Sequence, residues 1–253
     1  MKIKTDFHLG DFQEPGNTKP ILKAIKYALQ NKNLEQFGFF KFNDSYSDYE
    51  FVPCENLNSF NPHFFSSNNY DFYKSYLDKK IISLFHTHLI DSPEPSNLDK
   101  EISNSVGLPS FILSIKSKKS FLFYPRSYRP RPLVKRVFIP YFQDCITFVK
   151  DFYYLNLNIN LPNLFNDWSR DISNSNTKLI NNIEQFFNPL DLTEIKHGDL
   201  IVFKPIDFAL FHVAVCDNNS HYWHHPAGMY PSKELLVNID QNKVYKVYRY
   251  KDL

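Results

Sequence analysis

The sequence predicts a protein of mixed α and β structure (α+β) built from two domains. Segments with helical spacing of apolar residues alternate with short β-rich runs along the whole chain. Residues 125–132 hold three prolines and three arginines, a composition that neither a helix nor a central strand tolerates. We therefore expect a first domain over residues 1–124, a linker over 125–135 and a second domain over 136–253. The alternative is that residues 125–132 form a long surface loop within one domain.

Charge and cysteine content exclude several classes of protein. The 29 basic and 27 acidic residues give a net charge of +2, so no strong field attracts nucleic acid or an anionic membrane. Three cysteines cannot form a closed disulfide framework. The first residues lack the apolar stretch of a secretory signal, and no apolar run approaches the ~20 residues that span a bilayer. We expect a product made in the cytoplasm, with no nucleic-acid partner and no stable membrane insertion.

Local patterns predict the elements of the first half. In residues 18–32, Thr18 can cap a helix whose first turn holds Pro20, where a missing N–H costs nothing. The apolar, β-rich run 81–88 indicates a buried strand. The other expected elements are strands at 37–42 and 49–57, helices at 70–79 and 96–106, and a strand or hairpin at 111–124.

The second half predicts an antiparallel sheet with two helices. Residues 144–157 are apolar enough to form a helix packed largely inside the fold. A second helix is expected at 177–187, and strands at 199–204, 211–216, 221–225 and 244–250.

The most specific motif of the first half is a histidine pair followed by an aspartate. His86 and His88 stand two apart on a predicted strand, so both imidazoles project from the same face. Asp99 lies about one turn into the following predicted helix. Two imidazoles and a carboxylate suit a tetrahedral Zn²⁺ that keeps one position for water. Two alternatives remain: Ser96 with an acid three residues later is also an N-capping pattern, and the histidines could be ordinary exposed strand residues.

The spacing H-x-H, seven residues, S-x-x-D resembles the JAMM metallopeptidases, also called the JAB or MPN fold. The resemblance implies a JAMM/MPN-like α/β first domain with His86, His88 and Asp99 as zinc ligands. It also implies that Ser96 donates a hydrogen bond to the reaction oxyanion. One departure is Leu89, where the family usually has proline.

In the JAMM family a glutamate on an upstream element deprotonates the water. It usually lies in a segment like E-x-C-G-L, and residues 34–39 (LEQFGF) are similar, with phenylalanine in place of the cysteine. The resemblance therefore makes Glu35 the candidate general base, with Glu50 and Glu55 as weaker alternatives.

A cysteine motif carries the chemistry of the second half. Cys145 stands at the expected start of a helix, where backbone amides and the helix dipole favour the nucleophilic thiolate. Most free cysteines are instead small buried apolar residues, which is our interpretation of Cys54 and Cys216. His212 begins an apolar strand and His224 lies on the next, so adjacent antiparallel strands can bring them together. A thiolate, a base and a residue that orients the base form a nucleophilic triad.

The order of these motifs resembles the NlpC-type papain-like cysteine peptidases, which cleave peptidoglycan stem peptides. The matching features are Asp-Cys at 144–145, Gly-Asp at 198–199, His-Val at 212–213 and a polar residue twelve positions after the histidine. The resemblance implies a papain-like α+β second domain with Cys145 as nucleophile, His212 as base and His224 as the residue that orients it. Activity is expected to fall on the acid side of the histidine range.

Two assignments in this half stay open. His221 and His225 are near His224 and rank below it as the orienting residue. The family often has Ser-Gly after Asp-Cys, where this chain has Ile-Thr at 146–147. The oxyanion donor is therefore left between the Cys145 amide and, more weakly, Tyr141.

The two halves in this order resemble the tail tip assembly proteins of long-tailed phages, over about residues 5–245. Residues 131–136 and 232–234 share in the resemblance. It implies a peptidase at the virion tail tip, with bacterial peptidoglycan and other phage tail tip proteins as partners. The same architecture can occur in gene transfer agents and tailocins, so the type of particle stays open. The alternatives are a structural tail-tip assembly protein with vestigial sites and, from the first motif alone, a cellular deubiquitinase-like enzyme.

Overall fold

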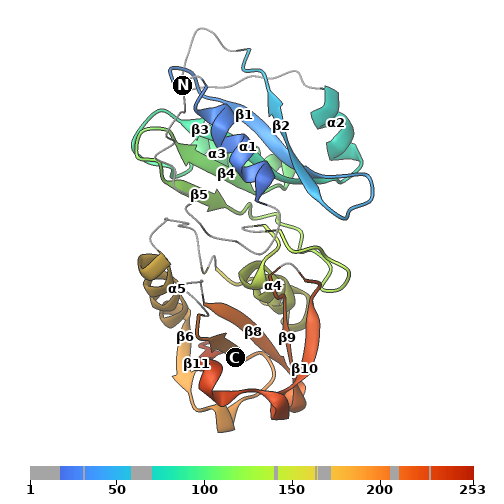
Figure 1. The fold of residues 1–253 in the computed structure, drawn as a ribbon, viewed down its shortest axis with the longest axis vertical. Coiled ribbons are helices and arrows are strands. Elements are labelled where there is room, and N and C mark those ends of the chain that lie inside the picture. The colour runs from blue at the N-terminus through green and yellow to red at the C-terminus, as the bar shows by residue number, and fades with distance from the viewer. Residues whose placement is uncertain are drawn as a thin grey trace. The chain divides into compact units, whose positions relative to one another are not determined.

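The computed structural model describes residues 18–30, 32–57, 70–139, 142–162, 164, 172–205, 211–227 and 229–253. Within these ranges the chain forms two compact units, which divide between Arg129 and Pro130. Each unit has its own sheet and its own helices (Figure 1). The mixed α and β class predicted from the sequence is confirmed.

The first unit is built on a five-stranded sheet with the strand order β2-β1-β3-β4-β5. Only β3 and β4 run parallel, and the other neighbours are antiparallel. The strands are β1 (Phe37–Phe42), β2 (Tyr49–Cys54), β3 (Ile81–His88), β4 (Ser110–Ser114) and β5 (Ser120–Phe123), and the helices are α1 (Lys19–Ala28), α2 (Tyr70–Leu77) and α3 (Asn97–Val106).

Helix α1 forms where it was predicted, but its expected cap does not. Thr18 has helical dihedrals, φ −87° and ψ −7°, and its side chain makes no capping hydrogen bond. A capping residue needs extended dihedrals to turn its side chain back onto the first turn, so the prediction for Thr18 is wrong. The helix is held instead by its buried face, which contains Ile21, Ala24 and Ala28.

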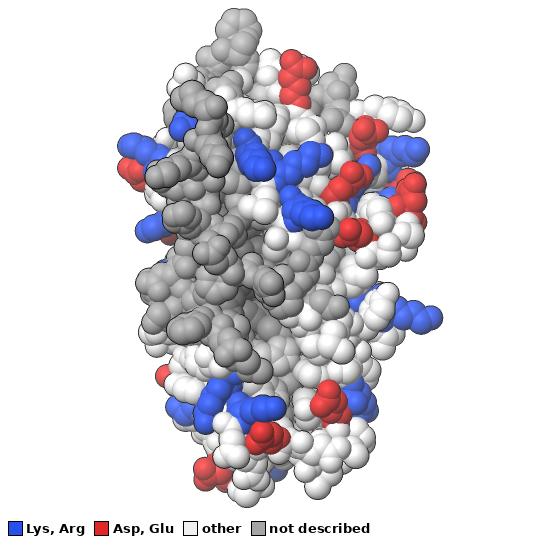
Figure 2. All heavy atoms as spheres, viewed as in Figure 1, with Lys and Arg blue, Asp and Glu red and all other residues white. Residues whose placement is uncertain are grey.

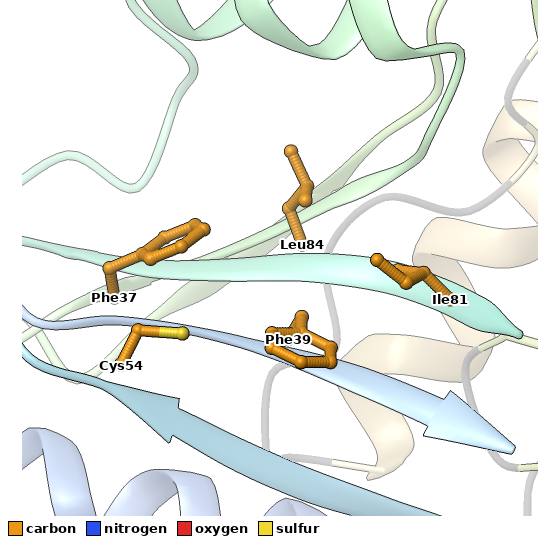
Figure 3. Close-up of a cluster of buried hydrophobic side chains, with 5 residues drawn as sticks. All are labelled: Phe37, Phe39, Cys54, Ile81 and Leu84. Atoms are coloured by element: carbon orange, nitrogen blue, oxygen red, sulfur yellow. The ribbon is translucent and has the colours of Figure 1, made fainter. Parts of the chain in front are cut away.

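The two faces of the first sheet carry separate apolar clusters because successive strand residues point to opposite sides. One cluster contains Phe37, Phe39 and Leu84 (Figure 3) and is covered by apolar residues of α2 and α3. The other face packs aromatic rings under α1, where Tyr27 lies 5.8 Å from Phe51 between ring centroids. Helices therefore cover both faces, and one of them, α3, begins beside the end of β3.

Gly38 lets β1 and β2 approach closely enough for this aromatic packing. A Cβ atom at Gly38 would lie 2.6 Å from ring carbons of Phe51 and 2.7 Å from the backbone oxygen of Val52. Gly38→Ala is therefore expected to lower the free energy of unfolding of this unit by about 1–3 kcal/mol, since a packed core yields little to added volume. Urea denaturation measures the loss.

A second glycine is the control for this prediction. At Gly107 a Cβ atom would meet nothing closer than 3.5 Å, although φ is +68°. Gly107→Ala should therefore cost only the positive-φ strain of about 1 kcal/mol. Equal stability of Gly38→Ala and wild type would contradict the close packing.

The second unit contains a six-stranded antiparallel sheet with the order β10-β9-β8-β7-β11-β6. Its strands are β6 (Phe187–Leu190), β7 (Leu200–Phe203), β8 (His212–Asp217), β9 (His221–His224), β10 (Ser232–Leu235) and β11 (Val244–Tyr250). Helix α4 (Cys145–Phe152) continues into a π-helical turn at Tyr153–Leu157, and α5 spans Ile172–Phe186. Strands β6 and β10 were not predicted. Each has only four residues; β6 contains a proline, and two of the four residues of β10 are charged.

The surface agrees with the near-neutral charge. Figure 2 shows basic and acidic side chains interspersed on the visible face, without a large field of one sign. Among the described helices, none is both long enough and apolar enough to span a bilayer.

Candidate catalytic sites

Three ligand-type side chains converge at the end of β3 in the first unit. His86 Nε2 and His88 Nε2 lie 3.2 Å apart. The Asp99 carboxylate places one oxygen 3.1 Å from His86 Nε2 and the other 3.2 Å from His88 Nε2. All three side chains are buried. The sequence-predicted ligands are therefore together, and within the described residues this is the one such cluster of histidine, cysteine or acidic groups.

The N-capping pattern of Ser96 is real, and it also holds Asp99 in place. The Ser96 backbone N–H donates to Asp99 Oδ2 at 2.7 Å, and the Asp99 N–H donates to Ser96 Oγ at 3.2 Å. This capping box fixes the first turn of α3 and turns the carboxylate toward the histidines. Ser96 is exposed, and its Oγ accepts in this contact, so its hydroxyl hydrogen is left to donate elsewhere.

The hydrogen-bond directions at His88 indicate that a proton or a metal ion lies between its Nε2 and the Asp99 carboxylate. His88 Nδ1 lies 3.1 Å from the Ser92 carbonyl oxygen, which can only accept, so Nδ1 carries the hydrogen. In the neutral ring Nε2 is then a lone pair, and it faces the Asp99 carboxylate and His86 Nε2. Lone pairs that face one another are stable only with a proton or a metal ion between them.

The donor set fits a zinc ion. Two atoms that each lie 2.0–2.1 Å from a tetrahedral zinc are about 3.3 Å apart, close to the three separations observed. A second-shell carbonyl at Nδ1, as Ser92 provides for His88, is the usual support of a zinc-binding imidazole. Burial would raise the pKa of Asp99, but hydrogen bonds from His86 and His88 hold it well below its ordinary value, so the carboxylate is charged and able to bind a cation.

Glu35 faces this cluster because of the strand register. Phe37 pairs with His86, and the backbone of Gln36 exchanges hydrogen bonds with Thr87. One step further along the same register, Glu35 stands opposite His88 on the same face of the sheet. Burial raises the pKa of Glu35 to about 8, and the nearby Asp99 carboxylate contributes to the rise while His88 opposes it.

The two alternatives to Glu35 do not reach the site. Glu50 and Glu55 are exposed, and the Glu50 carboxylate lies 3.4 Å from Lys41 Nζ. Of these three glutamates, Glu35 is therefore the one that the strand register places beside the histidines.

In the second unit, Cys145 is the first residue of α4, held by a second capping box. Asp144 Oδ1 accepts from the Thr147 N–H at 2.9 Å, and Thr147 Oγ1 accepts from the Asp144 N–H at 2.8 Å. The backbone of Val213, directly after His212, lies close enough to the thiol to lower its pKa, and α4 packs against β8. The start of α4 thus lies against the start of β8.

The expected resting thiolate is not what this environment favours. Burial raises the pKa of Cys145 to about 12, and the neighbouring Asp144 carboxylate adds to the rise. The backbone groups of Cys145, Ile146 and Val213 oppose this shift without overcoming it. The prediction from the helix dipole is therefore corrected: Cys145 rests as a neutral thiol and needs a base to remove its proton.

That base is available in a chain of hydrogen bonds. His212 Nε2 lies 2.9 Å from His224 Nδ1, and His224 Nε2 lies 3.0 Å from Glu234 Oε1. Burial lowers the pKa of His212 to about 3, so its ring is neutral near pH 7. Because His212 Nε2 is engaged with His224, the nitrogen left to accept a proton is Nδ1.

Strand periodicity separates His224 from its neighbours. His224 and Ser232 are cross-strand partners on β9 and β10, whereas His221 and His225 fall on the opposite face. His225 is fully buried, and its Nε2 lies 3.1 Å from the Met229 backbone oxygen. The ranking of both below His224 agrees with this geometry.

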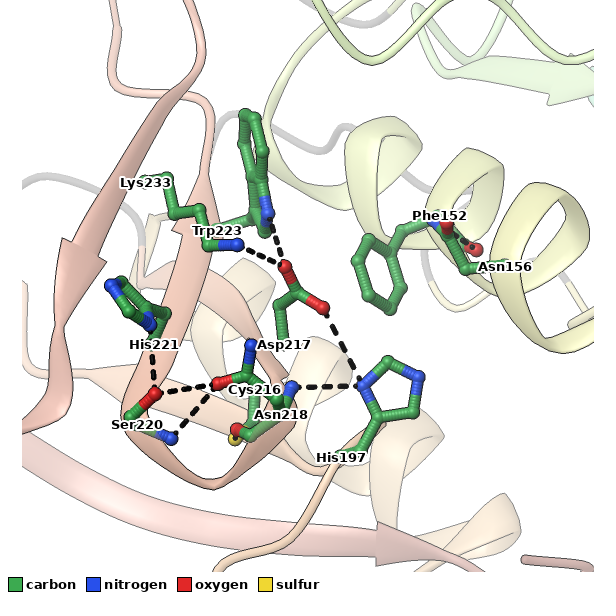
Figure 4. Close-up of polar contacts among 10 residues, drawn as sticks. All are labelled: Phe152, Asn156, His197, Cys216, Asp217, Asn218, Ser220, His221, Trp223 and Lys233. Carbon is green, nitrogen blue, oxygen red and sulfur yellow. Dashed lines mark hydrogen bonds and ion pairs between the residues drawn. The ribbon is translucent and has the colours of Figure 1, made fainter.

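Strands β8, β9 and β10 carry a second polar cluster, centred on Asp217, on the face opposite His212 and His224 (Figure 4). Asp217 Oδ2 accepts from Trp223 Nε1 at 2.9 Å and lies 2.7 Å from Lys233 Nζ. His221 bonds to Ser220 in the same cluster, at 2.9 Å. These contacts tie β8, β9 and β10 together away from His212.

The other two cysteines, Tyr141 and Glu234 complete the comparison with the sequence predictions. Cys54 and Cys216 are fully buried, which confirms the packing interpretation for both. Tyr141, the weaker candidate for an oxyanion donor, lies outside the described residues. Glu234 has no predicted role, although its two-residue spacing from Ser232 indicates that both side chains lie on the same face of a strand.

No known family model and no curated protein matches this chain. Solved structures do match. A solution structure of a protein from Desulfitobacterium hafniense is 24% identical, with 43% of this chain and 82% of that chain covered and a TM-score of 0.33.

Two crystal structures of NlpC/P60 family proteins also match. One, from Staphylococcus aureus and described as similar to a lipoprotein, is 17% identical, with 49% of this chain and 37% of that chain covered and a TM-score of 0.29. The other, from Bacillus cereus, is 13% identical, with 89% of this chain and 66% of that chain covered and a TM-score of 0.29.

Proposed function

We propose that the second unit is a cysteine peptidase that hydrolyses amide bonds in peptidoglycan stem peptides. The observation that carries the proposal is Cys145 at the start of α4, near the backbone of Val213, which directly follows a histidine whose Nε2 is bonded to a second histidine. The substrate class comes from the resemblance to NlpC-type peptidases, through the Asp-Cys, Gly-Asp and His-Val motifs.

The first half of the reaction forms a thioester. His212 Nδ1 takes the thiol proton as Cys145 Sγ attacks the amide carbonyl carbon, and the His212–His224 hydrogen bond holds the ring in place. The Cys145 backbone N–H at the helix start is the donor that we propose for the oxyanion. The C–N bond then breaks, the amine leaves with the proton from His212, and the acyl group remains on sulfur.

The second half restores the enzyme. Water attacks the thioester carbonyl while His212 Nδ1 accepts one of its protons. The C–S bond breaks, the acid product leaves, and His212 returns the proton to the Cys145 sulfur. Overall, one amide and one water give one amine and one carboxylic acid.

We further propose that the first unit is a zinc-dependent peptidase or isopeptidase. His86, His88 and Asp99 would hold the ion, which would act as a Lewis acid and lower the pKa of water. Glu35 holds or releases a proton on the buried face beside His88, and Ser96 offers a hydroxyl hydrogen at the exposed rim. The bond that this unit cleaves lies in a wall cross-link or in a tail protein.

The zinc proposal predicts metal retention that depends on these ligands. The intact chain should purify with about one zinc per molecule, and His88→Ala should carry none, because two remaining ligands are too few for a stable site. Elemental analysis of both proteins decides this. His197→Ala, which removes a half-exposed histidine of the second unit, should keep its zinc. A folded wild type without zinc, after dialysis against the metal, would contradict the proposal.

The pH dependence of the second unit follows from the lowered pKa of His212. The base acts in its neutral form, which is lost as the pH falls through its pKa; burial places that pKa near 3. We expect kcat/KM to vary little between pH 5 and pH 8, with the acid limb below the ordinary histidine value of about 6.5. The fall on the acid side that the sequence predicts is thus expected at a lower pH than for an ordinary histidine. A limb centred near 6.5 would show that His212 is not desolvated.

The biological setting that we propose is the tail tip of a phage or phage-like particle. It rests on the order of the two motif sets along the chain, with peptidoglycan and other tail tip proteins as partners. Immunogold labelling of particles should place the chain at the tail tip. Label confined to lysate fractions without particles would exclude this setting and leave the peptidase chemistry intact.

The test of the peptidase proposal uses purified peptidoglycan and the intact chain. Mass spectrometry of the soluble products should find stem-peptide fragments that each gain one water per cleaved amide. If no fragment is released and no tail protein is processed, the structural assembly role is favoured, in which one or both sites are vestigial.

A further inference from the structure

Glu234 occupies a position at the end of the histidine chain that the triad alone does not require. It lies on β10 and reaches His224 Nε2 with Oε1 at 3.0 Å. Its other oxygen, Oε2, accepts from the Tyr222 hydroxyl at 2.8 Å. Tyr222 and Glu234 are cross-strand partners, as are His224 and Ser232, so all four side chains lie on one face of the β9–β10 pair. The carboxylate is thus fixed by one neighbour and aimed at the other.

We infer that Glu234 is a positioning residue that fixes the tautomers of His224 and His212, and so keeps His212 Nδ1 free to accept the proton of Cys145. The inference deepens the proposed peptidase function and rests on it for the role of Cys145. The tautomers themselves follow from the hydrogen bonds of Glu234, whatever the substrate is.

The direction of each hydrogen bond follows from the carboxylate. Glu234 can only accept, so His224 Nε2 carries a hydrogen. In the neutral ring His224 Nδ1 is then a lone pair, and it must accept from His212 Nε2–H. His212 Nδ1 is in turn left without a hydrogen, which is the form that a general base needs. Without the carboxylate, His224 could adopt the other tautomer, with its hydrogen on Nδ1. His212 Nε2 would then have to accept that hydrogen, and the hydrogen of the neutral His212 ring would lie on Nδ1.

Ser232 shares this task with Glu234. Its hydroxyl oxygen lies 2.6 Å from His224 Nε2 and 3.5 Å from Glu234 Oε1. A hydroxyl can donate as well as accept, so Ser232 alone would permit either tautomer of His224, whereas the carboxylate permits one. Removal of Glu234 should therefore weaken the preference of His224 for the Nε2–H tautomer. Removal of both Glu234 and the Ser232 hydroxyl should abolish that preference.

Glu184 in the same unit is a matched control. Its side chain is 40% exposed, against 47% for Glu234. It also accepts from a tyrosine hydroxyl, Tyr248 at 3.1 Å, and from a cation, Lys246 at 3.0 Å. Glu184→Gln removes the same charge from a similar setting that lacks a histidine.

The first experiment reads the tautomers without any substrate. The intact chain is labelled with ¹⁵N-histidine, and two-bond ¹H–¹⁵N correlations of His212 and His224 are recorded for wild type, Glu234→Gln, Glu234→Ala and Glu184→Gln. Both rings should be in the Nε2–H form in wild type and in Glu184→Gln. In Glu234→Ala the Nδ1–H form should appear, and Glu234→Gln, which keeps an acceptor oxygen, should be intermediate. Unchanged tautomers in Glu234→Ala would overturn the inference.

The second experiment uses turnover of soluble stem peptides. Loss of a carboxylate that orients a metal-binding histidine costs roughly 10- to 100-fold, and we take the same scale for His224. We expect a fall of that size in kcat for Glu234→Ala, larger for Ser232→Ala/Glu234→Ala, with KM little changed and Glu184→Gln equal to wild type. Wild-type kcat in the double variant would also overturn the inference. If wild type itself cleaves nothing, the proposed function fails, and the tautomer measurement still decides the role of Glu234.

Discussion

His212→Ala will lower stem-peptide hydrolysis by the second unit by roughly 10³-fold or more, with binding of the peptide little changed. Burial keeps the Cys145 thiol protonated, with its pKa raised to about 12, so attack depends on a base at the thiol. The base that we propose is His212, which directly precedes Val213, whose backbone lowers the pKa of the thiol. Steady-state kinetics on a soluble stem peptide measures the loss in kcat.

His221→Ala is the control for this result. His221 lies on the neighbouring strand and contacts Ser220, on the face away from His212 and His224. It should retain wild-type turnover. A His212→Ala enzyme within tenfold of wild type would mean that another group activates Cys145.

Asp151→Ala will destabilise the second unit by about 3–5 kcal/mol, the usual cost of leaving one member of a buried ion pair without the other. Asp151 Oδ2 accepts from Arg136 Nη1 at 2.7 Å, and the two side chains are 0% and 2% exposed. The Arg136 guanidinium also reaches Thr147 Oγ1 at 3.3 Å, in the capping box that begins α4. Urea denaturation followed by tryptophan fluorescence measures the loss.

The double variant Arg136→Met/Asp151→Leu separates burial of an unpaired charge from loss of the pair. When both charges are replaced by apolar groups of similar size, the change in stability is often small or favourable. We expect the double variant to be nearer to wild type than Asp151→Ala. Equal stability of Asp151→Ala and wild type would show that the pair adds nothing to this unit.

Elements with a strong local pattern could be predicted from the sequence. The fully buried strand at 81–88 and the strand at 37–42 have the predicted bounds, because short, mainly apolar runs rich in aromatic and β-branched residues favour a buried strand. The helix that carries Asp99 begins at its predicted serine cap. The metal-type cluster followed from these elements, since a two-residue spacing on a strand fixes a common face.

What depended on long-range contacts could not be predicted. Strand β10 has a polar sequence, and its pairing with β9 is what brings Glu234 to His224. The thiolate expected at Cys145 followed from the local helix start, but desolvation by the surrounding fold outweighs the local amides. Thr18 likewise has the residue type of a cap without the backbone conformation. Local sequence encodes which residue types are present, and packing decides their charge and their partners.

The most direct measurement compares wild type, Cys145→Ala and Cys216→Ala on purified peptidoglycan, with fragment masses as the readout. Cys145→Ala should release no fragments that are cut within a stem peptide, whereas wild type and the buried-cysteine control should release the same set of such fragments, each with one added water per cleaved amide. Fragment release by Cys145→Ala equal to that of wild type would contradict the central claim that this thiol is the nucleophile.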